Sequence, residues 1–318
     1  MKKVIFITGA SSGLGKSTSL YFAQQGWNVI ATMRAPDKEE ELTNHSNIFV
    51  TKLDVSDPIS IQTAIMKGIE KFGQIDVLIN NAGYGQQGLF EAVSEEKVRE
   101  QFEVNVFGLM EVTRAVLPHF RSRKQGMIVN VTSGVGRVTV PLVSIYAASK
   151  FAVEGFSEAL SYELESQNIK VKIIEPGYVA TKFYERAATD YAHDVSLSDY
   201  DNFSKEMNTL FSAFGDQVTA GPQEVAKSIF EAVNDGTYKL RYVVGPDLEP
   251  LIALKSNKPD QEYVDTMRSQ FMPDAFKTNR SYEANPENII ADFGDFWIGR
   301  RRRDHRNFIL LSDRRRRE

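Results

Sequence analysis

The feature that most constrains the fold of this chain is a short apolar run followed at once by three closely spaced glycines. Val4-Ile5-Phe6-Ile7 indicates a strand buried on both faces, and a helical pattern follows the glycines. In Thr8-Gly9-x3-Gly13-x-Gly15, the first glycine permits a tight turn, the second lets the backbone approach a pyrophosphate, and the third lets the helix pack closely on the strand. The N-terminus of that helix offers unpaired N–H groups to phosphates. A glycine triplet alone is compatible with a plain helix cap, but this context predicts dinucleotide binding by Gly9, Ser11, Ser12, Gly13, Leu14 and Gly15.

Composition places the chain among ordinary globular proteins. With 318 residues, 42% hydrophobic and 25% charged, it is long enough for one full α/β core plus additions. The net charge of −4 gives no overall attraction to nucleic acid or to an anionic membrane. The absence of cysteine excludes disulfides and thiolate metal sites, and the four histidines are too scattered to predict a metal cluster. The first apolar run is too short for a signal peptide and no apolar run of spanning length follows, so we expect a cytoplasmic protein without a membrane span.

Strand-like and helical segments alternate along the first two thirds of the chain. Apolar runs recur at 28–33, 48–53, 76–80, 127–131 and 171–175. This alternation predicts an α/β fold with a doubly wound parallel sheet. In such a sheet ligands bind at the carboxyl ends of the strands, so the residues that follow each run are the candidates for a site.

The run at 28–33 ends in neutral residues and a cation. In a dinucleotide fold this strand end meets the adenosine ribose, where an acid would accept from a 2′-hydroxyl and repel a 2′-phosphate. Here Thr32 and Met33 are neutral and Arg34 follows. The planar, always charged guanidinium suits a phosphate, so Arg34 favours NADP(H) over NAD(H), unless it is only a solvated loop cation.

Two further strand ends indicate contacts with the nucleotide. Asp54 and Val55 would lie beside the adenine, although Asp54 is equally compatible with an ordinary loop residue. Asn81, Ala82 and Gly83 combine small residues, which allow close approach to a ribose, with an amide that ties neighbouring loops together.

The sixth run leads to the expected nicotinamide end. Pro176-Gly177 turns the backbone sharply after this strand. The hydroxyl of Thr181 is placed to meet a carboxamide. The predicted contacts here are Pro176, Gly177, Val179 and Thr181.

A tyrosine and a lysine four residues apart are the candidate acid/base pair. On a helix Tyr146 and Lys150 share one face, and a nearby cation lowers the pKa of a phenol. The spacing alone is more often just an amphipathic helix surface. Ser133 ends the fifth strand and converges with Tyr146 on one substrate oxygen. Asn105 lies in a largely apolar helical row, where it either satisfies backbone at a bend or holds water near the site.

These motifs together resemble the short-chain dehydrogenase/reductase family over about residues 3 to 245. The resemblance implies a single-domain Rossmann fold of about seven parallel strands. It also implies that Tyr146 is the general acid in carbonyl reduction, that Lys150 lowers its pKa and holds the nicotinamide ribose, that Ser133 orients the carbonyl, and that Asn105 supports a water relay. The Ala-Thr-Met-Arg stretch with Ser12 is similar to NADP(H)-preferring members, including carbonyl reductases and the 17β-hydroxysteroid and retinol dehydrogenase branch. Family members often form dimers or tetramers, so we expect a homo-oligomer.

The segment after Thr181 predicts a substrate lid. Aromatic residues are frequent at 183–215, which suits an apolar inner face and a hydrophobic aldehyde, ketone or secondary alcohol, although ordinary core packing explains any single one as well. The candidate lining residues are Tyr84, Leu142, Tyr178 and Phe183. We expect the oxidoreductase domain to cover 1–254 and a polar extension with two arginine runs to cover 255–318.

Two other functions share parts of this pattern. A nucleotide-sugar epimerase or dehydratase also uses Tyr-x3-Lys, but the Gly-x3-Gly-x-Gly spacing and the short C-terminal portion argue against it. A non-catalytic NADP(H)-sensing protein would bind the nucleotide without turnover.

Overall fold

The chain is described from a computed structural model, which covers residues 2–179, 181–215 and 220–271. It divides into two units, Met1–Asn257 and Lys258–Glu318. The first unit holds the sheet and the site. None of the helices in the described ranges has both the length and the apolar character that crossing a bilayer requires.

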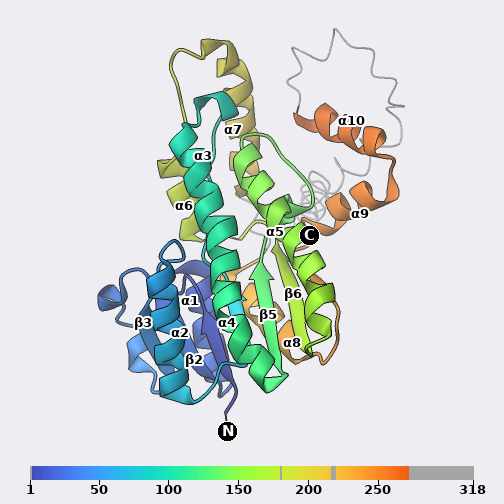
Figure 1. The fold of residues 1–318 in the computed structure, drawn as a ribbon. Helices are drawn as coiled ribbons and strands as arrows, with labels where there is room; N and C mark the ends of the chain where they lie inside the picture. Colours follow the sequence, from blue (N-terminus) through green and yellow to red (C-terminus); the bar gives the residue numbers. More distant parts are fainter. Residues whose placement is uncertain (1, 180, 216–219, 272–318) are drawn as a thin grey trace, which may run out of the picture. The chain divides into compact units, whose positions relative to one another are not determined.

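Seven strands form one sheet in which every pairing is parallel (Figure 1). The strand order is β3-β2-β1-β4-β5-β6-β7, so the chain winds outward from β1 in one direction and then from β4 in the other. This confirms the predicted doubly wound sheet, and the reversal between β1 and β4 is where such folds bind ligands. The strands are β1 (Val4–Ile7), β2 (Asn28–Met33), β3 (Ile48–Lys52), β4 (Val77–Asn80), β5 (Gly126–Val131), β6 (Ile169–Pro176) and β7 (Arg241–Val244).

Helices cover both faces of the sheet, which is why the central strands β1 and β4 are almost entirely apolar. Alternate residues of β1 belong to two separate cores: Ile5 packs with residues of α1 (Gly13–Gln24) and α8 (Pro222–Asn234). Phe6 packs in the other core, whose helical side comes from α2 (Pro58–Phe72), α4 (Leu109–Arg123) and α5 (Ser144–Glu165). The two-sided burial explains why the first apolar run shows no alternation.

Local signals set the start and end of α2. The Asp57 carboxylate accepts from the backbone N–H groups of Ile59 and Ser60, and Pro58 occupies the first turn. Gly73 ends the helix with φ +82°, a left-handed conformation that favours glycine.

The helical row around Asn105 is not one regular α-helix. It consists of α3 (Glu95–Phe102), a π-helical segment η4 (Glu103–Gly108) and then α4. Asn105 lies within this wider π turn. In a regular α-helix its side chain would point in a different direction from the helix axis. At the end of this turn Gly108 lies so close to Val55 that an added Cβ would be 2.8 Å from the valine Cβ. Sequence periodicity did not reveal this interruption.

The remaining elements include helices in the predicted lid. α6 (Lys182–Thr189) and α7 (Asp201–Gly215) occupy most of 183–215, and α9 (Glu249–Asn257) ends the first unit. Short 3-10 turns are η1 (Pro36–Lys38), η2 (Leu42–Asn44), η3 (Phe90–Ala92), η5 (Gly134–Gly136) and η6 (Ser198–Tyr200).

The second unit contains one described helix, α10 (Asp260–Phe271). The sequence predicts only a polar extension here. Acidic residues in the first turn and a lysine–glutamate pair, Lys258 to Glu262 at 2.5 Å, favour the helix locally. The two arginine runs of the extension lie outside the described residues.

Candidate active site

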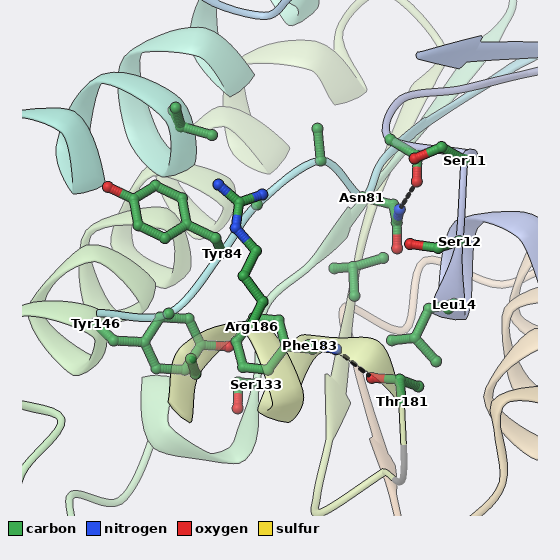
Figure 2. Close-up of a pocket in the computed structure, with 18 of the residues that line it drawn as sticks. Ser11, Ser12, Leu14, Asn81, Tyr84, Ser133, Tyr146, Thr181, Phe183 and Arg186 are labelled. Carbon is green, nitrogen blue, oxygen red and sulfur yellow. Dashed lines mark hydrogen bonds between the residues drawn. The ribbon is translucent and has the colours of Figure 1, made fainter. Parts of the chain in front are cut away.

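A cleft of about 800 Å³ opens at the carboxyl ends of the central strands (Figure 2). It brings together most of the residues predicted from the sequence. Those that line it are Gly9, Ser11, Ser12, Gly13, Leu14, Arg34, Asp54, Val55, Asn81, Ala82, Gly83, Tyr84, Ser133, Tyr146, Lys150, Pro176, Gly177, Val179, Thr181 and Phe183. Four predicted residues do not line it: Gly15, Asn105, Leu142 and Tyr178.

The glycine loop is shaped by close backbone contacts. Gly9 has φ +68°, and a Cβ there would lie 2.8 Å from the Cα of Ala82. A Cβ on Gly15 would lie 2.3 Å from the carbonyl oxygen of Gly9. Gly15 is therefore required for packing beneath the loop, although it does not face the cleft. The Asn81 amide donates to the carbonyls of Thr8 and Gly9 at 3.0 and 3.1 Å, which confirms its predicted role as a tie between two loops.

The first turn of α1 fits the pyrophosphate of a dinucleotide. Ser12 stands at the N-cap with extended backbone, and its side chain makes no capping hydrogen bond. Ser11, Ser12 and Leu14 flank the same side of the cleft in Figure 2. The first N–H groups of a helix have no partner within the helix, so this turn presents donors to an anion in the cleft.

Arg34 lies exposed at the other end of this wall. Its guanidinium forms no hydrogen bond or ion pair with another described residue, and it lines the cleft. Met33, not an acid, precedes it at the end of β2. Asp54 also lines the cleft, and its Oδ1 accepts from the N–H of Ser56 at 3.0 Å.

Ser133, Tyr146 and Lys150 meet where β5 ends against the start of α5. The Ser133 side chain lies close enough to the Tyr146 hydroxyl to lower the pKa of the phenol, and both side chains line the cleft. The Lys150 ammonium lies 5.7 Å from the centroid of the Tyr146 ring and donates to the carbonyl of Val131 at 2.9 Å. One substrate oxygen can therefore reach both hydroxyls with a buried cation one helical turn away.

The pKa of Tyr146 is shifted against the direction expected from the sequence. Burial raises the pKa of Tyr146 to about 12, and the hydrogen bond from Ser133 only partly opposes this. Burial also lowers the pKa of Lys150 to about 8, while the charge of Glu154 opposes the shift. The expectation considered the attraction between cation and phenolate but not the cost of desolvating both groups, and that cost dominates.

Asn105 acts on the backbone of Tyr84. Its amide donates to the Tyr84 carbonyl at 2.9 Å and to the Ser149 hydroxyl at 3.2 Å, and its Oδ1 accepts from the Tyr84 N–H at 3.1 Å. Of the two roles left open by the sequence, these contacts correspond to satisfying backbone groups. Asn105 thereby fixes the segment that carries Tyr84 into the cleft.

Aromatic rings and charged groups bound the far end of the cleft. The Phe183 ring lies 5.5 Å from the Tyr146 ring, and the Arg186 guanidinium lies over Tyr84 at 5.4 Å (Figure 2). Burial and the nearby Glu100 carboxylate raise the pKa of Tyr84. Thr181 accepts from the Phe183 N–H at 3.3 Å and so caps α6.

The two predicted substrate contacts that do not line the cleft have backbone interactions elsewhere. The carbonyl of Leu142 accepts from the N–H of Gly88 at 2.9 Å. The N–H of Tyr178 donates to the Asp247 carboxylate at 2.9 Å. Their contact with a substrate stays a prediction.

Three charged residues at the far end of the cleft were not predicted from the sequence. Arg186 and Asp190 of α6 and its continuation line the cleft, as does Glu100 of α3. Arg186 and Asp190 lie at helical spacing from Phe183 and Ala187 after the Thr181 cap. This periodicity could have indicated that they face the same side as Phe183. No sequence pattern indicated Glu100, because α3 lies far from α6 along the chain and the two helices meet at the cleft only in the folded structure.

The family model "short chain dehydrogenase" matches residues 3–192. An uncharacterized oxidoreductase of Schizosaccharomyces pombe is 40% identical over 241 residues, which cover 75% of this chain and 99% of that protein. The 3-ketodihydrosphingosine reductase of Bacteroides thetaiotaomicron is 35% identical over 259 residues, covering 81% and 94%.

Solved structures share the fold. ElxO with NADP bound is 27% identical with a TM-score of 0.63, covering 76% of this chain and 98% of that one. A 3-ketoacyl-(acyl-carrier-protein) reductase from Brucella melitensis complexed with NADH is 24% identical with a TM-score of 0.66, covering 77% and 98%. From the family match, the relatives and the seven-stranded sheet, the chain belongs to the short-chain dehydrogenase/reductase family, whose enzymes act on CH–OH groups with NAD(P).

Proposed function

We propose that this enzyme is an NADP(H)-dependent oxidoreductase that interconverts a carbonyl and an alcohol, with Tyr146 as the proton donor and acceptor. The observation that carries the proposal is that Ser133, Tyr146 and Lys150 line the same cleft as the glycine loop. A substrate oxygen at this pair would lie beside any nucleotide held by the loop.

The chemistry divides between the nucleotide and the chain. The nicotinamide ring supplies or accepts the hydride when bound. Ser133 orients the substrate oxygen and Tyr146 exchanges a proton with it. With its pKa raised to about 12, Tyr146 is protonated at neutral pH and so begins a reduction in the form that donates. The ammonium of Lys150 stabilises the phenolate left behind, and its pKa of about 8 keeps it mostly charged at pH 7.

Arg34 supports the preference for NADP(H). It is an exposed cation that lines the cleft without a partner among the described residues, and no acid stands at the end of β2. A 2′-phosphate would give its guanidinium a charged acceptor. Solved members of the fold hold either nucleotide, so the preference rests on Arg34 alone.

The aromatic end of the cleft supports a hydrophobic substrate. The rings of Tyr84 and Phe183 flank the position of Tyr146, and Phe183 lies so near the loop after β4 that a Cβ on Gly85 would be 2.7 Å from its Cζ. Such walls suit an apolar group next to the reacting carbon. Self-association and a cytoplasmic location stay predictions.

A substrate panel with both cofactors tests the proposal. The purified chain is mixed with NADPH or NADH and a series of aldehydes and ketones of increasing apolar size, and loss of reduced-nicotinamide absorbance is followed. Secondary alcohols with the oxidised cofactors give the reverse direction. We expect turnover with NADPH and at least one hydrophobic carbonyl, at a kcat/KM about tenfold or more above that with NADH. Tight NADPH binding without turnover of any compound would instead indicate a cofactor-sensing protein.

A further inference from the structure

Three consecutive residues at the end of β5 each contact one side chain of α5, the long helix that runs beside β6 in Figure 1. The carbonyl of the first accepts from the catalytic lysine, the hydroxyl of the second donates to a buried glutamate, and the side chain of the third lowers the pKa of the tyrosine. The pairs are Val131 with Lys150 at 2.9 Å, Thr132 with Glu154 at 2.7 Å, and Ser133 with Tyr146. The first and third pairs belong to the proposed site, whereas the Thr132–Glu154 pair lies behind it and has no assigned role.

Glu154 is buried and its carboxylate is fully occupied. Only 4% of the residue is exposed. One oxygen accepts from the Thr132 hydroxyl, and the other accepts from Nε of Arg241 at 3.0 Å. A buried carboxylate with a hydrogen bond and a cationic partner keeps its negative charge.

The backbone of η5 covers the side of α5 between Lys150 and Glu154. A Cβ on Gly136 would lie 3.2 Å from Cγ of Glu154 and 3.3 Å from Cβ of Lys150. The two side chains are one helical turn apart on this covered face. Because water is excluded there, the attraction between their charges is screened less than at a surface.

Arg241, the cationic partner of Glu154, belongs to a wider charge network. It also pairs with Glu158 at 2.5 Å and with Glu175 at 3.4 Å, and Arg137 pairs with Glu175 at 3.1 Å. The Lys255 amine donates to the Arg137 carbonyl at 2.6 Å. Burial and the charge of Glu154 raise the pKa of Glu175, so the two carboxylates compete for the same arginine. Of these carboxylates, only Glu154 acts on the charge of Lys150.

We propose that Glu154 is a positioning residue for the active site, which holds α5 in register with the end of β5 through Thr132 and keeps the buried Lys150 ammonium protonated. This inference rests on the proposed function only where it concerns turnover. The charge of Lys150 at neutral pH then depends on a carboxylate that touches neither substrate nor cofactor.

The test is a titration of Lys150 in Glu154→Gln. Side-chain NMR of the selectively labelled lysines gives the midpoint, and Lys150→Met identifies the Lys150 signal. The amide of glutamine is nearly isosteric with the carboxylate but has no charge. We expect the Lys150 midpoint, about 8 in the natural protein, to fall by about one pH unit or more. The high-pH fall of kcat in carbonyl reduction should move down by the same amount.

Glu158→Gln is the matched control. It removes the same charge from the same helix and from the same arginine, but Glu158 lies one turn farther from Lys150 and its side chain is 43% exposed. We expect its Lys150 midpoint to be unchanged. Glu154→Asp keeps the charge, so its Lys150 midpoint should lie near that of the natural protein. Thr132→Val should reduce kcat without moving the midpoint.

A second variant covers the case in which Glu154→Gln does not fold. The double substitution Glu154→Gln with Arg241→Gln removes both members of the buried pair, together with the contacts of Arg241 to Glu158 and Glu175. It should lower the Lys150 midpoint as well. An unchanged midpoint in either folded variant would overturn the inference. If the natural enzyme turns over no substrate, the proposed function fails while the titration still decides the role of Glu154.

Discussion

Lys150 lies one helical turn after Tyr146, yet it donates its hydrogen bond to the carbonyl of Val131 at 2.9 Å and not to the phenol. Its ammonium is 5.7 Å from the centroid of the Tyr146 ring. The cation is therefore fixed to the end of β5 and acts on the phenol through space. Burial disfavours the charged form of each group, so it raises the pKa of Tyr146 and lowers the pKa of Lys150.

The buried lysine should reduce the stability of the protein at neutral pH. Its pKa falls from the ordinary 10.5 to about 8, which corresponds to about 3 kcal/mol against the charged form. Lys150→Met removes this cost but leaves the Val131 carbonyl without its donor, at about 1 kcal/mol. We expect the variant to be about 1–2 kcal/mol more stable at pH 7 in denaturant unfolding, and inactive.

The pH dependence of that difference follows from the direction of the shift. Between about pH 8 and 10.5 the unfolded chain retains the lysine proton that the folded chain has lost, so the stability of the natural protein rises with pH through this window. The advantage of Lys150→Met should shrink over the same range. Lys67→Met, at an exposed lysine of α2, should show neither effect. A variant that is less stable than the natural protein at pH 7 would mean that Lys150 is not strongly desolvated.

Arg34→Gln should change the cofactor preference. Removing a charged contact with a 2′-phosphate costs about 1.5–3 kcal/mol, so the KM for NADPH should rise about 10-fold to 100-fold. The KM for NADH should hardly change, because NADH has no such phosphate. Lys38→Gln removes an exposed cation of η1 that does not line the cleft, and it should leave both values as they are. An equal effect on NADH and NADPH would contradict the role given to Arg34.

Phe183→Ala should weaken the binding of hydrophobic substrates. Its ring lies 5.5 Å from that of Tyr146 and forms part of the apolar wall. Loss of such a ring removes roughly 1.5–3 kcal/mol of apolar contact, so the KM for the largest good substrate should rise about tenfold or more. The KM for NADPH measures any damage to α6 in the same experiment. Phe90→Ala, at a ring that is 64% exposed, is the control. If small and large substrates respond equally, Phe183 does not set the size preference.

Sequence reasoning worked best where local backbone demands a residue type. Gly9 has the left-handed φ of +68° and Gly15 packs against the Gly9 carbonyl, so these two positions indicate the loop from its own backbone. The four-residue spacing of Tyr146 and Lys150 is equally local. Interactions between distant segments were not accessible in this way: the pairing of Thr132 with Glu154, the approach of Glu100 to Tyr84, and the desolvation that raises the pKa of Tyr146.

The most direct test of the central claim is single-turnover reduction by Tyr146→Phe, with NADPH affinity measured on the same preparation. Phenylalanine preserves the ring beside Phe183 but removes the hydroxyl that would exchange the proton. We predict NADPH binding within about twofold of the natural enzyme and a rate of hydride transfer lower by about 10²-fold or more, as is usual for loss of a general acid. A variant that binds NADPH normally and keeps most of its rate would contradict the claim that Tyr146 supplies the proton.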